Sequence, residues 1–295
     1  MPYGQASGNY IKTTYMRKLT LFLSCLLLAF GAMAQNPTAV DLSVTRHGPE
    51  HGSLVIIGGG RMTDELWDRF LSLAGGSEAR IVVITNASAP EDTSYFSTIR
   101  NLSNRLGKDR VSRMHLTTID EANDDRNLKE LRRATGVFIT GGRQWRIAEV
   151  YLNTKVHREL FALLDRGGVI AGTSAGASIQ GSLLWRGDTR GAQHLIGDHT
   201  QGLGFLKLSA IDQHILVRNR QHDLDAFIKA APEFIGIGID ESTAIVVTGD
   251  EFEVIGKSYV AVHQAGRERF FFLRPGQRYD LKEHKPIQVN RQQNQ

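Results

Sequence analysis

The chain has 295 residues, of which 41% are hydrophobic, so it is long enough to bury one large α/β core or two small ones. Its 35 basic and 31 acidic residues give a formal net charge of +4. No dense run of Lys and Arg with interleaved aromatic residues occurs, which argues against a nucleic-acid partner.

The first 34 residues have the pattern of a secretion signal rather than of a folded domain. A basic start at Arg17 and Lys18 precedes an apolar run over residues 19–30, and an A-x-A cleavage motif ends at Ala34. The alternative, an uncleaved membrane anchor, would need a longer apolar run. We therefore expect cleavage after Ala34 and export to the periplasm or the outside of a bacterial cell, with no membrane attachment of the mature protein.

We interpret Met16 as the true start and residues 1–15 as an upstream extension, and we expect residues 35–295 to form a single α/β domain. Cleavage would remove three basic and no acidic residues, which leaves 32 basic against 31 acidic residues and a formal net charge of +1. The only cysteine, Cys25, lies inside the signal. The mature chain then has no thiol, which excludes disulfides, cysteine-bound metals and a cysteine nucleophile.

Through most of the chain, apolar runs of strand length alternate with segments of helical periodicity. The expected strands cover residues 53–60, 79–88, 110–118, 136–142 and 168–174. The expected helices lie within residues 61–76, 91–107, 128–134, 145–168 and 175–184. Continuous apolar strands separated by helices predict a mostly parallel sheet with helices on both faces.

The pattern changes after residue 235. Short apolar runs joined by Gly-Asp and Gly-Lys turns predict a C-terminal antiparallel extension of the sheet. We expect the polar tail after Pro275 to be partly disordered.

A G-x-S-x-G pattern over Gly172–Gly176 stands between an expected strand and an expected helix. In that position the glycines permit a sharp turn that exposes the hydroxyl of Ser174 above the carboxyl edge of the sheet. The N–H of Ala175 would then point to where an oxyanion forms. The alternative is a plain strand–helix loop, in which small residues are also common.

A serine nucleophile needs a base, and His214 is the best placed of the ten histidines. It ends an apolar run, and polar groups at the carboxyl edge of such a sheet are where α/β sites assemble. Glu241 ends another apolar run and is either a turn residue or an acid that orients the histidine. The order Ser, His, Glu argues against the α/β-hydrolases, in which the acid precedes the histidine.

With these residues in place, the chain resembles the cyanophycinase-like serine peptidases of family S51. The resemblance is carried by "IGGG", "ITGGRQ", "GTSAGAS", "IDQHILVRNR" and "GIGIDESTA", in this order and spacing. It implies a flavodoxin-like fold of the kind found in class I glutamine amidotransferases, with serine in place of their cysteine. It also implies no metal and no organic cofactor, and a homodimer, because members are commonly dimers.

The resemblance implies a role for each matching residue. Ser174 would be the nucleophile, His214 the general base and Glu241 the residue that orients the histidine. Gln144 would help to position the substrate, and Gly142 would add a second N–H to the oxyanion hole beside that of Ala175. Asp212, two residues before the histidine, is counted with the substrate-binding residues.

Family members cut isopeptide bonds that involve the β-carboxyl group of aspartate, and cyanophycinases cut cyanophycin into β-Asp-Arg dipeptides. The guanidinium groups of Arg218 and Arg220 suit the free carboxylates of such a substrate. In the cyanophycin-cleaving pattern R-x-R-x-x-R-L, however, Asp223 stands where the third arginine would be. A carboxylate there would repel a substrate carboxylate, so the polymer itself is open to question as the substrate.

Three other functions are alternatives for the same sequence features. One is an aspartyl or isoaspartyl dipeptidase of the same family, which would use the same triad on short peptides. Another is a secreted binding protein that keeps the fold without the chemistry. A nucleotide-binding domain is disfavoured, because a G-x-G-x-x-G motif after the first strand would need glycine where Thr63 stands.

Overall fold

A computed structural model describes residues 44–89 and 91–288, and all of them belong to one compact unit. The predicted signal peptide, its cleavage site and Cys25 lie outside this part of the chain. Within it, no helix has the length and apolar character needed to cross a bilayer.

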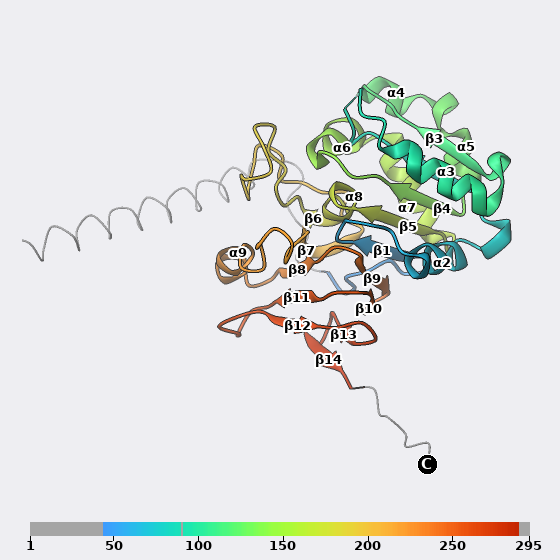
Figure 1. Cartoon of the computed structure of the whole chain (residues 1–295). Helices are drawn as coiled ribbons and strands as arrows, with labels where there is room; N and C mark the ends of the chain where they lie inside the picture. The colour runs from blue at the N-terminus through green and yellow to red at the C-terminus, as the bar shows by residue number, and fades with distance from the viewer. Residues whose placement is uncertain (1–43, 90, 289–295) are drawn as a thin grey trace, which may run out of the picture. The chain divides into compact units, whose positions relative to one another are not determined.

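The elements alternate along the chain, as Figure 1 shows by colour. The strands of the first half are β1 (Ser53–Ile57), β2 (Ile81–Ile84), β3 (Val111–Met114), β4 (Gly136–Ile139), β5 (Val169–Thr173) and β6 (Gly181–Leu183). The later strands are β7 (Leu206–Gln213), β8 (Ile235–Ile239), β9 (Thr243–Thr248), β10 (Glu251–Gly256), β11 (Val260–His263), β12 (Phe271–Leu273), β13 (Arg278–Asp280) and β14 (Lys285–Ile287). The helices are α2 (Asp64–Leu73), α3 (Tyr95–Leu106), α4 (Ile119–Asn123), α5 (Lys129–Arg133), α6 (Gln144–Tyr151), α7 (Lys155–Asp165), α8 (Ala175–Ser178) and α9 (Asp225–Ala230).

The larger sheet has nine strands in the order β14-β13-β10-β9-β1-β5-β4-β2-β3. From β1 to β3 all pairs are parallel, with Ile57 opposite Thr173 at the carboxyl end of the β1–β5 pair. Beyond β1, strands β9, β10, β13 and β14 are antiparallel. The predicted combination of a parallel sheet with an antiparallel C-terminal extension is therefore present.

Both faces of the parallel part are covered by helices. Because side chains alternate along a strand, Val55 and Ile57 of β1 belong to a core cluster with Phe70 of α2. Leu54 of β1 belongs to the cluster on the other face, with Leu160 of α7. This arrangement confirms the predicted α/β fold with helices on both faces.

Five strands form a second sheet in the order β12-β11-β8-β7-β6, which the sequence did not predict. Strands β7 and β8 pair in parallel, so β8 is not part of an antiparallel extension of the first sheet. Two further strands that the sequence did not predict, β13 and β14, continue the large sheet in the described part of the tail after Pro275. The second sheet matters for function because His214 follows β7 and Glu241 lies just beyond β8.

Candidate active site

Ser174 occupies a sharp turn between β5 and α8. Its backbone has φ 55° and ψ −112°, a strained conformation that is rare outside functional sites. The Ser174 N–H donates to the carbonyl of Ile57 at 3.0 Å, which ties the turn to β1. A β-carbon on Gly172 would lie 2.0 Å from the carbonyl oxygen of Gly176, so the turn needs this glycine.

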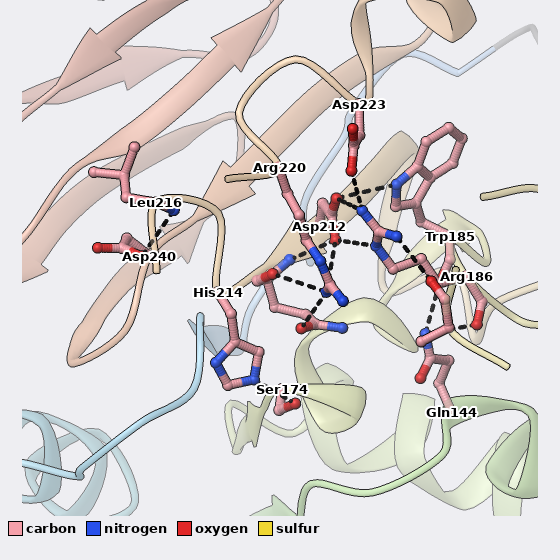
Figure 2. A network of polar contacts seen from close by, with 12 residues as sticks. Gln144, Ser174, Trp185, Arg186, Asp212, His214, Leu216, Arg220, Asp223 and Asp240 are labelled. Carbon is pink, nitrogen blue, oxygen red and sulfur yellow. Dashed lines mark hydrogen bonds and ion pairs between the residues drawn. The ribbon is translucent and has the colours of Figure 1, made fainter. Parts of the chain in front are cut away.

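Three chain segments bring Ser174, His214 and Glu241 together. The Oγ atom of Ser174 lies 2.9 Å from Nε2 of His214, and Nδ1 of His214 lies 2.6 Å from Oε1 of Glu241. Figure 2 shows the histidine ring above the serine side chain. His214 is 6% exposed, and its φ of 56° turns the chain sharply at the end of β7. The three residues are thus within hydrogen-bonding reach in the order that nucleophile, base and orienting acid require.

The glycines that follow β1 form the wall against which this histidine packs. A β-carbon on Gly59, whose φ is 111°, would lie 2.1 Å from Cε1 of His214. One on Gly60 would lie 2.7 Å from the side chain of Glu241. The sequence analysis counted these glycines among the family motifs and weighed them as a nucleotide-binding loop, but it did not predict this role, although three consecutive glycines after a buried strand were a visible signal.

The environment of His214 favours its neutral form. Burial lowers the pKa of His214 below its ordinary value, and the charges of Arg218 and Arg220 act in the same direction. The hydrogen bond that His214 donates to Glu241 opposes them without cancelling them. A neutral imidazole can accept the proton of Ser174, so this shift suits a general base at neutral pH.

The backbone donors predicted for an oxyanion hole lie beside the serine turn. Ala175 is the first residue of α8, and the loop that holds Gly142 follows β4, the neighbour of β5. A β-carbon on Gly141 would touch Cβ of Ser174 at 3.4 Å. Among residues 44–89 and 91–288, neither the Ala175 N–H nor the Gly142 N–H has an acceptor. Neither group is therefore committed to a backbone hydrogen bond in this part of the chain.

A buried ion-pair network around Arg186 lies beside the triad (Figure 2). The Arg186 side chain is 3% exposed, and its Nε and Nη2 donate to the two oxygens of Asp212 at 2.8 and 2.9 Å. Its Nη2 also donates to Asp223, and its Nη1 to the carbonyl of Ala192. Burial disfavours the charge, but the bonds to Asp212 and Asp223 outweigh it and raise the pKa of Arg186. Sequence reasoning did not identify Arg186, which no motif marks.

The Trp185–Arg186 segment is bound by two buried residues that were predicted to bind substrate. The carboxylate of Asp212 is 1% exposed and also accepts from Nε1 of Trp185 at 3.2 Å. The amide of Gln144, which is 2% exposed, donates to the carbonyls of Trp185 at 2.8 Å and Arg186 at 3.0 Å. In this structure both side chains therefore hold the Trp185–Arg186 segment in place.

The other predicted substrate-binding residues are more open. Asp223 is 31% exposed, and its pairing with Arg186 offsets the negative charge that was expected to repel a carboxylate. Arg220 is partly buried, with two long contacts of 3.4 Å from Nη1 to Gln213 and an ion pair of 3.9 Å from Nη1 to Asp212. Burial and the nearby charge of Arg186 lower the pKa of Arg220. Arg218 is exposed and the contacts of Arg220 are long, so these two cations are the predicted substrate-binding residues least engaged with other side chains.

Solved structures with the same fold include peptidases. The crystal structure of a peptidase from an acI-B1 Actinobacterium matches with a TM-score of 0.60 at 22% identity, over 79% of this chain and 98% of that one. A putative peptidase E protein from Listeria monocytogenes matches with a TM-score of 0.52 at 18% identity, over 70% of this chain and 100% of that one.

Sequence comparisons go further than the fold. The cyanophycinase of Geminocystis herdmanii is 30% identical over 261 residues, which span 80% of this chain and 96% of that protein. The cyanophycinase of a Nostoc species is 32% identical over 203 residues, or 67% of each chain. The family model for peptidase family S51 matches residues 54–255. This chain is a serine-type peptidase that belongs to family S51.

Proposed function

We propose that this peptidase hydrolyses β-aspartyl isopeptide bonds with Ser174 as nucleophile, His214 as general base and Glu241 as the acid that orients the base. The observation that carries the proposal is the continuous hydrogen-bonded chain from Ser174 through His214 to Glu241, with the serine on a strained turn at the end of β5. A hydroxyl, an imidazole and a carboxylate in this arrangement have the geometry of serine hydrolase triads on unrelated folds.

Each triad member then has one task in the reaction. Nε2 of His214 takes the proton of Ser174 as Oγ attacks the carbonyl carbon, and returns it to the leaving amine. Glu241 accepts a hydrogen bond from Nδ1–H of His214 and thereby fixes the tautomer of the ring. It also stabilises the imidazolium that forms between the two proton transfers. The N–H groups of Ala175 and Gly142 would stabilise the oxyanion, and one such donor is typically worth on the order of 10²- to 10³-fold in rate. Water then repeats the sequence on the acyl-enzyme.

The substrate class follows from the free cations and from the relatives. Arg218 and Arg220 lie close enough to His214 to affect its charge, so they can hold a substrate carboxylate near the reacting bond. The cyanophycinases among the relatives suggest cyanophycin, cut to β-Asp-Arg dipeptides. Asp223 favours a second candidate, an aspartyl or isoaspartyl dipeptidase acting on short peptides, because it leaves fewer free cations for a substrate with many carboxylates.

Export and assembly belong to the same proposal. The basic start, apolar run and A-x-A motif of residues 1–34 support secretion to the periplasm or beyond the cell. The mature protein would act there without a cofactor, as a homodimer. Its partners would be peptides or polymers that contain β-linked aspartate.

Product analysis on defined substrates tests the proposal. The purified protein is incubated with cyanophycin and, separately, with β-Asp-Arg and β-Asp-Leu, and products are followed by mass spectrometry. Release of β-Asp-Arg from the polymer supports a cyanophycinase, while cleavage of the dipeptides alone supports the second candidate. Ser174→Ala should keep the fold and lose turnover. Equal turnover by this variant and the wild type would contradict the triad.

A further inference from the structure

Two neighbouring acids after β8 bind different parts of the His214 region: the ring of the histidine and the turn that follows it. Glu241 contacts its ring, whereas the side chain of Asp240 points to the backbone of the turn that follows the histidine (Figure 2). Oδ1 of Asp240 accepts from the N–H of Leu216 at 3.0 Å and from that of Val217 at 3.2 Å. Oδ2 accepts from the hydroxyl of Ser258 at 2.6 Å, and Asp240 is 5% exposed.

The turn after His214 depends on an outside acceptor. It has the form of a short helical turn, in which the N–H of Arg218 donates to the carbonyl of His214 at 3.0 Å. The first N–H groups of such a turn have no partner within it. Asp240 supplies that partner from 24 residues away, as a charged cap.

Apolar packing and a backbone bond anchor only the start of this turn. Ile215 is fully buried, and the His214 N–H donates to the carbonyl of Gly58 at 2.9 Å. Leu216 is 36% exposed and Val217 64% exposed, so the side chains of the next two residues do not anchor the turn. The backbone of His214 has a φ of 56°, which a non-glycine residue holds only when its surroundings enforce it. The same backbone conformation directs the ring between Ser174 and Glu241. What fixes the turn therefore also fixes the ring.

We propose that Asp240 is a positioning residue for catalysis, which holds the turn after His214 so that Nε2 stays on the Ser174 hydroxyl. This inference rests on the proposed role of His214 as general base. Asp240 makes no hydrogen bond to Ser174, His214 or Glu241, and it acts only through the backbone of the turn that follows the histidine. The β8–β9 connection thus holds this region at two points, the His214 ring through Glu241 and the following turn through Asp240.

The test uses an organophosphate that needs no substrate recognition. Diisopropyl fluorophosphate phosphorylates an activated serine with loss of fluoride, and mass spectrometry gives the rate of labelling of Ser174. The variants are Asp240→Ala, Asp240→Asn and Ser258→Ala, each checked for folding by circular dichroism and thermal unfolding. Ser258→Ala is the matched control, because it removes the Oδ2 contact and keeps both backbone bonds.

Asp240→Ala should label about 10- to 100-fold more slowly, since a displacement of about 1 Å at a reacting group costs on the order of 10²-fold. Asp240→Asn keeps a neutral acceptor and should fall between Asp240→Ala and wild type, whereas Ser258→Ala should stay within about twofold of wild type. The charged groups that act on His214 are Glu241, Arg218 and Arg220. A loosened bond to Glu241 lowers the pKa of His214 further, so the midpoint of the pH–rate curve should move to lower pH in Asp240→Ala.

Three results would overturn the inference. The first is a folded Asp240→Ala that labels at the wild-type rate, and the second is a Ser258→Ala that labels as slowly as Asp240→Ala. The third result applies if Asp240→Ala does not fold: Asp240→Asn and Ser258→Ala would then label Ser174 at equal rates. A wild-type protein that is not labelled at Ser174 would instead refute the proposed function, and this inference with it.

Discussion

Gly59 lies directly against the ring of His214, and a β-carbon at Gly59 would sit 2.1 Å from Cε1 of the histidine. Real β-carbons do not approach other heavy atoms so closely, so either the loop or the ring must move when any side chain is added. The loop after β1 therefore limits, by direct contact, where the histidine ring can lie beside Ser174.

Gly59→Ala should reduce kcat by about 100-fold or more, because the displaced ring loses its alignment with Ser174. Gly249→Ala is the matched control: Gly249 also has a positive φ, of 57°, but no atom lies within 4 Å of its would-be β-carbon. Both variants carry backbone strain and only one disturbs the site. Similar kcat values for the two would show that the contact with His214 is unimportant.

The pH dependence of kcat/KM should report the lowered pKa of His214. The enzyme needs the neutral form of His214 as its base, so kcat/KM should rise as the pH rises. The midpoint of this rise should lie below the ordinary histidine pKa of about 6.5. Arg220→Gln removes a charge that lowers this pKa, so the midpoint should move up. Glu241→Gln removes the bond that raises it, so the midpoint should move down while the rate falls. If the midpoint were the same in both variants as in the wild type, the rise in kcat/KM would reflect the titration of a group other than His214.

Arg186→Gln should destabilise the fold by about 3–5 kcal/mol, because it leaves the buried carboxylate of Asp212 without its cation. Chemical denaturation measures the loss. Arg133→Gln is the control, since Arg133 and its partner Glu130 form an ion pair in which both side chains are more than half exposed. Equal unfolding midpoints for the two variants would mean that Asp212 does not depend on Arg186.

Asp223→Asn should lower the KM for β-aspartyl substrates by a few-fold and leave kcat almost unchanged. The change removes a negative charge that acts on Arg220, so the positive charge that attracts a substrate carboxylate is less compensated. Arg186 keeps its bidentate partner Asp212, so the fold should persist. The measurement is steady-state hydrolysis of a β-aspartyl dipeptide, and a raised KM would instead favour a direct role for Asp223 in binding.

The alternation of apolar strands and helical segments was enough to predict the α/β fold with covered faces, since periodicity reports which side of each element is buried. It could not predict that β7 and β8 leave the main sheet to form a second one, because both runs look equally apolar in either sheet. The polarity of the tail also gave no sign of its two strands. Strand β13 is held by ladder bonds to β10, and β14 by ladder bonds to β13, which polarity does not report.

By itself the sequence determined the candidates for the chemistry: a serine between two turn-forming glycines, a histidine and a glutamate that each end an apolar run. These signals are local, since a turn or a strand end is specified by the residues that form it. Only the tertiary structure decided what surrounds them, namely Arg186 between Asp212 and Asp223, and Asp240 beneath the His214 turn. Such contacts join residues 24 to 37 positions apart. These contacts depend on how the two sheets pack, and they cannot be predicted from the spacing of residues along the chain.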